Sequence, residues 1–561
     1  MNTLRTALVS FVLIATHGVL AADSNSFPVA IHVHASTTLE SLKPIWRFFG
    51  ADEPNYATMP NGKKLMGELG AMRPDDVFFR AHNLLTSGDG TASFKWGSTG
   101  AYSEDANGKP VYNWTILDGI FDTYRASNVR PYVEIGFMPE ALSTKPEPYQ
   151  HHFDPKARNN QLFTGWTYPP TDYDKWAELV YQWAQHAVQK YGKAEVEHWY
   201  WEVWNEANIG YWHGTPEEFY RLHDLATAAV RRALPSAKVG GMDSAGGGEP
   251  LRRFLEHCAH GTNYATGAVG TPLDFVSFHA KGSPSYVSNH VRMGISAELR
   301  TIDSSFGIVA SFPEYKKKPI VIGECDPESC AACLGAQYGF RNGTMYSSYT
   351  ADCFAHIYDL ARKHDVNIDG ALTWAFEFEG QPPFAGFRSV ASGGIDLPVM
   401  NVFRMFSKMP AQRLAVESDG AVALADVVRN GVREKPEVSA LASSASNRVV
   451  VMVWHYHDDD VEGPAADVEL NVDGIPRQFH QASVHQFRID ADHSNAFTVW
   501  EKMGSPQKPT AEQYAQLEKA AKLAELDYPK MMAVEKSEIH LKVNLPRAAV
   551  SLFVLDYNPA L

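Results

Sequence analysis

The chain has 561 residues, 45% of them hydrophobic and 20% charged, so it can bury a large core and is not a disordered protein. Its 50 Lys and Arg residues are outnumbered by 65 Asp and Glu residues, and the net charge of −15 argues against a nucleic-acid-binding protein. No apolar run of about 18 residues occurs beyond the N-terminus, which excludes a protein with several membrane spans.

The first 22 residues have the pattern of an export signal. Arg5 precedes an apolar stretch at residues 7–15, and small residues follow at the expected cleavage positions up to Ala22. We predict a signal peptide over residues 1–22, no membrane span after its cleavage, and a periplasmic or secreted mature protein. An uncleaved N-terminal anchor is the alternative.

Short apolar strands alternate with helical patterns from about residue 44 to residue 400, which is typical of a parallel sheet. The predicted strands lie at residues 46–50, 77–80, 130–135, 198–203, 238–242, 275–279, 320–323 and 371–374. About eight such units close a barrel, so the pattern predicts an α/β fold with a (β/α)8 TIM barrel over residues 37–405. An open doubly wound sheet is the alternative, although no G-x-G-x-x-G motif follows a strand.

Two helices of this region have clear signals. One has a stripe of apolar residues between Trp176 and Ala187 and ends at Gly192. The other begins at Thr215, where the sequence Thr-Pro-Glu-Glu predicts a capping box closed by Glu218.

The sequence pattern changes from alternating strands and helices to mainly strands after about residue 410. Strands are predicted at residues 449–454, 467–472 and 551–557, with a helical insert at residues 510–525. An early strand at residues 27–36 is expected to pair with them. We therefore predict an additional all-β, sandwich-like domain made of residues 23–36 and 406–561.

Two carboxylates directly follow predicted barrel strands. Glu206 ends the strand in HWYWEVWNE, among aromatic residues that disfavour a charged carboxylate, as a general acid requires. Glu324 ends the apolar strand in PIVIGE. The carboxyl ends of barrel strands meet at one mouth, and glycoside hydrolysis is typically catalysed by a pair of carboxylic acids at one site. For Glu206 taken alone, a surface glutamate that opens a loop is the alternative.

The segment WEVWNEAN, followed by EFYRLHDLATAAVRRALPSAKVGG, resembles glycoside hydrolase family 39, a family of clan A retaining barrel enzymes that includes β-xylosidases and α-L-iduronidases. DFVSFH at residues 274–279 and the segment at residues 485–510 also resemble this family, so the resemblance covers most of the mature chain. It implies that Glu206 is the acid/base, that Glu324 is the nucleophile, and that neither a metal nor another cofactor is required.

The resemblance also implies a substrate-binding set. His82, in an R-x-H motif, and His279 would bind sugar hydroxyls, and Asn205 would bind the 2-hydroxyl. Trp374 would form the floor of the sugar subsite, and Glu377 and Glu379 in WAFEFEG would bind further hydroxyls. For His82 the alternative is a core histidine, and for one of the two glutamates a solvated loop charge.

The sequence departs from the family pattern in three places. Ala207 follows Glu206 where proline is common, Lys281 stands where many xylosidases have an aromatic residue, and the loop after Glu324 reads CDPESCAAC. We predict that Lys281 contacts a carboxylate or a sugar hydroxyl, with solvent as the alternative. The five cysteines are Cys258, Cys325, Cys330, Cys333 and Cys353. We predict one local disulfide of open pairing rather than a metal site.

The predicted function is a retaining exo-glycosidase that acts on oligosaccharides, foremost a β-D-xylosidase. The alternatives are α-L-arabinosidase, β-glucosidase or α-L-iduronidase specificity, with Lys281 and Arg388 as candidate cations for a uronate, and a non-catalytic carbohydrate-binding protein. His455 and His457 precede three aspartates and suggest a metal, but a strand that runs into an acidic turn is the favoured interpretation.

Overall fold

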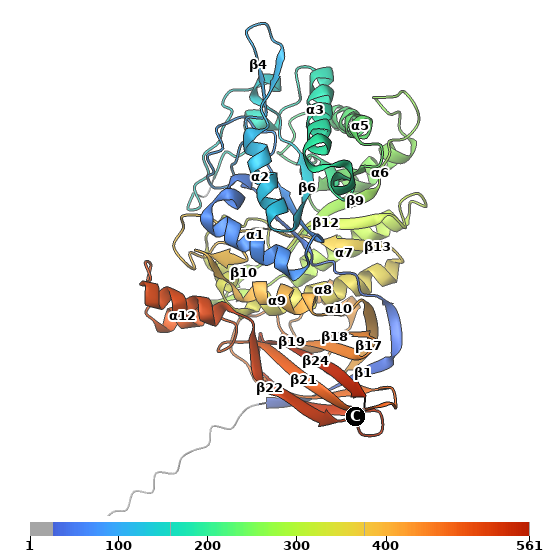
Figure 1. The fold of residues 1–561 in the computed structure, drawn as a ribbon, viewed down its shortest axis with the longest axis vertical. Helices are drawn as coiled ribbons and strands as arrows, with labels where there is room; N and C mark the ends of the chain where they lie inside the picture. Colours follow the sequence, from blue (N-terminus) through green and yellow to red (C-terminus); the bar gives the residue numbers. More distant parts are fainter. Residues whose placement is uncertain (1–25, 158, 375, 560–561) are drawn as a thin grey trace, which may run out of the picture.

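The computed structural model describes residues 26–157, 159–374 and 376–559, and the predicted signal peptide lies outside them. Figure 1 shows a barrel above a smaller β domain, with helices α8, α9 and α10 between the two. No helix in the described ranges is long and apolar enough to cross a membrane.

The barrel confirms the predicted fold class. Its parallel sheet has the order β13-β12-β9-β8-β7-β6-β3-β2-β14. Strands β13 and β14 follow each other in the chain and act as the eighth barrel strand. They close the barrel, because β13 pairs with β12 while β14 pairs with β2. Every predicted barrel strand is present. The strands are β2 (Phe48–Ala51), β3 (Val77–Ala81), β6 (Val129–Ile135), β7 (Tyr200–Val203), β8 (Lys238–Ser244), β9 (Phe275–Lys281), β12 (Pro319–Asp326), β13 (Asn367–Ala371) and β14 (Thr373–Trp374).

Alternation along the strands divides the barrel interior into two layers. Phe275 belongs to an aromatic cluster inside the barrel, while Ser277, His279 and Lys281 follow at every second position of β9 and carry polar groups toward the carboxyl ends. The same change from apolar to polar occurs on β3, between Phe78 and Arg80. The mouth of the barrel is therefore lined by charged groups above an aromatic plug.

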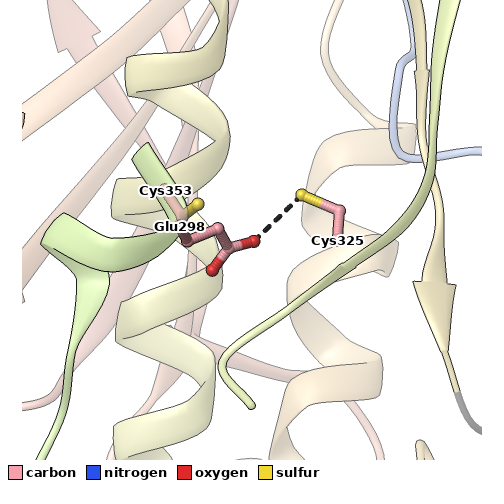
Figure 2. Close-up of side chains that lie close together, drawn as sticks. All are labelled: Glu298, Cys325 and Cys353. Carbon is pink, nitrogen blue, oxygen red and sulfur yellow. Dashed lines mark hydrogen bonds between the residues drawn. The ribbon is translucent and has the colours of Figure 1, made fainter. Parts of the chain in front are cut away.

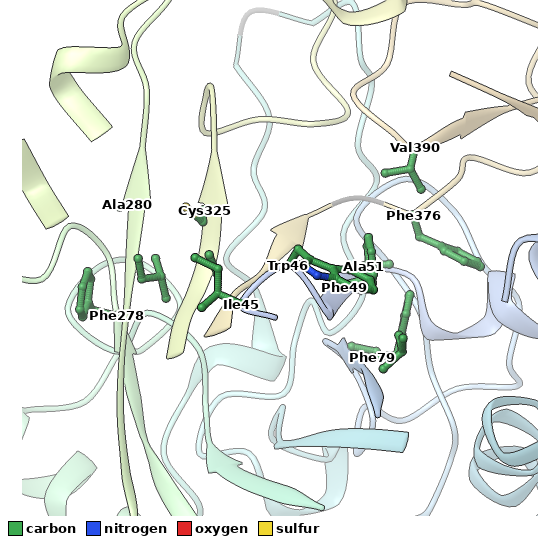
Figure 3. Packing of buried hydrophobic residues seen from close by; sticks show 14 of the residues in the cluster. Ile45, Trp46, Phe49, Ala51, Phe79, Phe278, Ala280, Cys325, Phe376 and Val390 are labelled. Carbon is green, nitrogen blue, oxygen red and sulfur yellow. The ribbon is translucent and has the colours of Figure 1, made fainter. Parts of the chain in front are cut away.

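Residues at the other strand positions face the surrounding helices. Phe79 packs edge-on against Phe376, with ring centroids 4.9 Å apart, in the core between strands and helices (Figure 3). Both predicted helix signals are present: Gly192 follows α3 with a φ of 84°, and Thr215 and Glu218 form the capping box of α5. The main helices are α1 (Pro60–Met72), α2 (Thr115–Ala126), α3 (Tyr173–Tyr191), α4 (Lys193–Val196), α5 (Pro216–Ala233), α6 (Gly248–His260), α7 (Ile295–Ala310), α8 (Thr344–His364), α9 (Pro398–Ser407) and α10 (Leu424–Asn430).

The β domain is one nine-stranded sheet of order β22-β21-β24-β19-β18-β17-β1-β20-β23. The early strand pairs into it as predicted and is longer than expected, because β1 runs from Ser26 to Ser41. Buried side chains from both halves of the sheet form one core, which makes the domain sandwich-like. Its remaining strands are β17 (Gln412–Ser418), β18 (Glu437–Ala445), β19 (Arg448–Tyr456), β20 (Ala465–Asp473), β21 (Phe479–Ile489), β22 (Ala524–Ala533), β23 (Ile539–Leu545) and β24 (Val550–Pro559).

The helical insert contains α11 (Ala496–Lys502) and α12 (Ala511–Ala521). Helix α12 reaches back to the barrel, where Lys64 of α1 lies 2.7 Å from Glu518. The described residues also form three short hairpins: β4 (Tyr102–Glu104) with β5 (Pro110–Tyr112), β10 (Ser285–Val287) with β11 (His290–Arg292), and β15 (Ala391–Ser392) with β16 (Ile395–Asp396).

Candidate active site

Glu206 lies just beyond the end of β7 on a strained backbone. Trp204 and Glu206 have φ values of 69° and 44°, a region that L-residues rarely adopt, and the Glu206 N–H donates to the carbonyl of Asp243. Such strain persists where the surrounding structure imposes it, and it is common at functional sites. Here it places the Glu206 carboxylate 2.8 Å from Nδ1 of His279.

Glu324 reaches the mouth of the barrel through a β-bulge. The register between β12 and β9 shifts between Ile322 and Glu324, so that Glu324 pairs with His279 and faces the interior. Position 323 in this bulge leaves no room for a side chain, because a Cβ there would lie 2.1 Å from Oδ2 of Asp243. Glu324 and Asp326 consequently point inward.

Cations surround the Glu324 carboxylate. Nζ of Lys281 lies 2.6 Å from Oε2, while Arg80 and His82 lie 3.5 and 3.6 Å from Oε1. Burial alone would raise the pKa of Glu324, but the charges of Lys281 and His279, with a hydrogen bond from His82, hold this pKa well below its usual value. The carboxylate is therefore ionised, as a nucleophile must be.

His279 joins the two carboxylates. Its Nδ1 lies 2.8 Å from Oε1 of Glu206 and 3.8 Å from Oε1 of Glu324, and its Nε2 lies 3.3 Å from Asp243. Burial would lower the pKa of His279, but the negative charges of Glu324 and Asp243 raise it to about 10. The two glutamates, 118 positions apart in the sequence, thus meet at one imidazole.

Arg80 organises a buried layer below the two glutamates. Its guanidinium lies 2.8 Å from Glu134, 2.6 Å from Glu202 and 2.9 Å from Asp243. It also donates to Oδ1 of Asn205 at 2.9 Å, which leaves the buried Asn205 amide nitrogen without a partner among the described residues. Asn205 does not line the cavity, so its contact with the 2-hydroxyl of a sugar stays a prediction.

His82 and Trp374 form another wall of the site. Nδ1 of His82 lies 2.9 Å from Asp52, which also pairs with Lys95 at 3.0 Å. The His82 ring packs against Trp374, with centroids 4.5 Å apart. Burial would lower the pKa of His82, but Glu134 and Asp52 raise it to about 9. Only Trp374 of this pair lines the cavity, together with Asp52 and Lys95.

A cavity of about 410 Å³ lies between these groups. This volume is at the lower end for small-molecule sites, which are about 300–1,000 Å³. The cavity is lined by Asp52, Lys95, Leu162, Glu206, Ile209, Tyr211, Ala245, Gly246, His279, Lys281, Thr301, Glu324, Ser329, Cys330, Ala331 and Trp374.

The cysteine-rich loop forms part of the cavity wall. Cys330 and Cys333 are joined by a disulfide, which resolves the pairing that the sequence left open. Cys258, Cys325 and Cys353 are free and buried. Cys325 does not line the cavity, and its thiol lies 3.1 Å from Glu298. Figure 2 shows this thiol directed toward Glu298, with Cys353 beside them.

The structure separates Glu377 and Glu379 from the other predicted site residues. Glu377 accepts a hydrogen bond from the N–H of Gly394, and Glu379 accepts from the N–H groups of Asn61 and Gly62 at the start of α1. Neither lines the cavity. Their carboxylates order the chain after β14 instead, because this segment folds back onto α1.

The histidines near residue 456 likewise bind protein groups. His455 contacts the carbonyl of Leu545, and His457 contacts the carbonyl of Arg433 and the N–H of Asp459. Strand β19 ends at Tyr456. The favoured interpretation, a strand that runs into an acidic turn, agrees with this geometry.

Several buried groups of the site were not predicted from the sequence. Glu134, Glu202 and Asp243 lie within strands that otherwise read as apolar, and Asp52 and Lys95 lie in loops. A carboxylate inside a buried strand is costly unless it is paired, so Glu134 and Glu202 carried a signal that could have linked them to Arg80.

A closed (β/α)8 barrel with two carboxylates that meet in a small cavity at its carboxyl end defines a barrel glycoside hydrolase. The model of glycosyl hydrolases family 39 matches residues 29–533, and the chain belongs to this family.

Relatives of two specificities match most of the chain. A β-xylosidase of Geobacillus stearothermophilus is 25% identical over 507 residues, which cover 85% of this chain and 86% of the relative. An α-L-iduronidase of Homo sapiens is 24% identical over 562 residues, which cover 92% and 77%. Among solved structures, a monomeric β-xylosidase from Caulobacter crescentus CB15 has a TM-score of 0.72 at 19% identity, covering 94% of this chain and 99% of that one.

Proposed function

We propose that this glycoside hydrolase is a retaining exo-glycosidase that removes terminal β-D-xylosyl residues from xylo-oligosaccharides. In the first step Glu324 attacks the anomeric carbon while Glu206 protonates the leaving oxygen. In the second step Glu206 deprotonates a water molecule, which hydrolyses the glycosyl–enzyme ester and regenerates Glu324.

The observation that carries this mechanism is the shared contact with His279. Oxygens that lie 2.8 and 3.8 Å from the same Nδ1 atom cannot be farther apart than the sum of these two distances. That upper limit falls at the short end of the spacing of inverting enzymes, about 6.5–9.5 Å, and allows the spacing of about 5–5.5 Å of retaining enzymes. The geometry therefore favours direct attack by Glu324.

Charge pairing in the cavity favours a neutral terminal sugar. Lys281 contacts both Glu324 and Asp326, and Lys95 contacts Asp52. Arg388, which does not line the cavity, lies 2.9 Å from Glu328 and 3.3 Å from Asp326. These cations are already matched by carboxylates, whereas a uronate would add another negative charge. The xylosidase relative, which aligns over most of both chains, points to the same class of sugar.

A second candidate is α-L-iduronidase activity. Lys281 lies on the cavity wall beside the nucleophile, and relatives with this activity also cover most of the chain. A uronate that displaced Asp326 from Lys281 would find a cation there.

A panel of aryl glycosides tests the proposal: β-D-xyloside, α-L-arabinoside, β-D-glucoside and α-L-iduronide, with Glu324→Ala as the inactive control. We expect the highest kcat/KM with the xyloside, and proton NMR should show β-xylose as the first product. Preference for the iduronide would select the second candidate, and α-xylose as the first product would exclude retention.

We also infer that the mature enzyme is periplasmic or secreted. The support is the charge and hydropathy pattern of residues 1–22 and the disulfide between Cys330 and Cys333, a bond that forms mainly in oxidising compartments. Cell fractionation of the tagged full-length chain tests this inference.

A further inference from the structure

Three side chains meet between the barrel and the β domain, outside the catalytic cavity. Asp352 and His356 lie one turn apart on α8, and Glu437 is the first residue of β18. Nε2 of His356 lies 3.4 Å from Oδ1 of Asp352 and 3.3 Å from Oε2 of Glu437. All three side chains are buried, with at most 7% exposed.

Acidic groups outnumber basic groups in this cluster. Two carboxylates face one imidazole, and in the described part of the chain neither Asp352 nor Glu437 has an ion pair with a lysine or an arginine. A protonated His356 balances one of the two carboxylates, and the other must be protonated or paired with a cation, because an unpaired buried charge is unfavourable. A divalent cation bound to a neutral imidazole would bring the sum to zero.

The distances have the size expected for ligands around one small ion. Direct imidazole–carboxylate pairs in this protein include distances of 2.6 Å, between His364 and Asp303, and of 3.3 Å, between His279 and Asp243. Zinc binds nitrogen and oxygen at about 2.0–2.2 Å, so the edges of its tetrahedron are about 3.3–3.5 Å. The two contacts of His356 match these edges, and one ligand atom from each residue lies within 4.8 Å of the other two.

The surroundings add the features of a metal site. Trp454 of β19 donates from Nε1 to Oδ1 of Asp352 at 2.8 Å, which fixes the orientation of the carboxylate as outer-shell hydrogen bonds do in metal sites. The other oxygen of Asp352 is buried and has no hydrogen-bond partner among the described residues. We propose that Asp352, His356 and Glu437 bind a zinc ion that fastens the β domain to the barrel.

This ion would have a structural role. None of its three ligands lines the catalytic cavity, while α8 and β18 belong to the two different domains. A second buried group of metal-binding residue types, Glu298, Cys325 and Cys353, is internally satisfied, because Glu298 accepts hydrogen bonds from both Cys325 and Tyr349. This group contains thiols, so a metal bound there could be distinguished from a metal bound to Asp352, His356 and Glu437.

The test uses the full-length enzyme without a histidine tag. The protein is dialysed against a chelator and titrated with Zn²⁺, and bound metal is measured by mass spectrometry. We expect one tightly bound zinc per chain and a rise of at least about 2 °C in the unfolding temperature, with kcat for the aryl substrate unchanged. His356→Gln should lose both the zinc and the rise, whereas His364→Gln, a histidine of the same helix paired with Asp303, should keep them.

Cobalt identifies the ligands in the wild-type enzyme, so the test does not depend on folding of the variant. A tetrahedral Co²⁺ spectrum without a thiolate charge-transfer band supports the nitrogen and oxygen site. A thiolate band would instead assign binding to Cys325 and Cys353. Absence of stoichiometric binding in the wild type, or equal binding by His356→Gln, would overturn the proposal.

Discussion

Nζ of Lys281 lies 2.6 Å from Oε2 of Glu324 and is closer to this carboxylate than any other cation in the described chain. The lysine comes from β9 and the glutamate from the neighbouring strand β12, and the bulge at Gly323 brings them together. A lysine bound to Glu324 keeps this carboxylate ionised but also lowers its basicity. The pH range in which the enzyme is active should therefore depend on Lys281.

Replacing this lysine should narrow the pH range of activity. In Lys281→Met the pKa of Glu324 should rise, because the largest opposing charge is lost while burial remains. The acid limb of kcat/KM against pH should move to higher pH, with little change above about pH 7, since Arg80, His82 and His279 still favour ionisation. Lys64→Met, which breaks an ion pair with Glu518 on α12, is the control. An unmoved acid limb would contradict this account.

The configuration of azide products should assign the two glutamates. Glu206→Ala should lower kcat by about 10²–10⁴-fold, the contribution of a general acid–base. Added azide should restore turnover and give a β-glycosyl azide, because it attacks the glycosyl–enzyme from the face that water uses. In Glu324→Ala, azide should enter from the opposite face and give the α-azide. The reverse pattern would exchange the two roles.

Glu379 should act on stability rather than on substrate binding. Its carboxylate accepts hydrogen bonds from the N–H groups of Asn61 and Gly62, which would otherwise be unsatisfied at the start of α1. Glu379→Ala should cost about 1 kcal/mol of unfolding free energy, as loss of a helix cap does, and leave KM unchanged. Urea unfolding and steady-state kinetics measure both effects. A KM raised tenfold at full stability would restore the sugar-binding role predicted from the sequence.

The meeting of Glu206 and Glu324 at one site was predictable from the sequence because each of them directly follows an apolar strand. Side-chain periodicity places the end of a strand, and barrel topology places all such ends at one mouth. Periodicity does not give the direction of a loop, so the contact of Glu379 with the start of α1 could not be predicted. Nor does it reveal the bulge at Gly323, because register depends on the neighbouring strand.

The disulfide should affect substrate affinity more than stability. Cys330 lines the cavity, and its bond to Cys333 closes a loop too short to remove much chain entropy from the unfolded state. Arg341 also holds this loop, donating to the carbonyls of both cysteines. Cys333→Ser should raise KM about 3–10-fold and change stability by less than about 1 kcal/mol. Cys258→Ser, a buried free cysteine of α6, is the control, and an unchanged KM in Cys333→Ser would exclude a role of the bond in shaping the cavity.

His82 should make stability depend on pH in the alkaline range. Its pKa is raised in the fold from 6.5 to about 9, because Glu134, Asp52 and Glu324 favour the imidazolium. A raised pKa stabilises the protonated folded state, so this contribution is complete below about pH 6.5 and disappears as the pH rises through about 9. The shift corresponds to about 3 kcal/mol.

Urea unfolding of the wild type and of His82→Gln between about pH 6 and pH 10 measures this contribution. The difference in unfolding free energy should be largest and constant below about pH 6.5 and should shrink toward pH 9, because the wild-type histidine then loses its proton in both states. His364→Gln, whose partner Asp303 is partly exposed to solvent, should give a much smaller difference. A difference for His82→Gln that stays constant across this range would mean that the histidine is neutral in the folded enzyme. It would then contact Asp52 and Glu134 as a neutral imidazole.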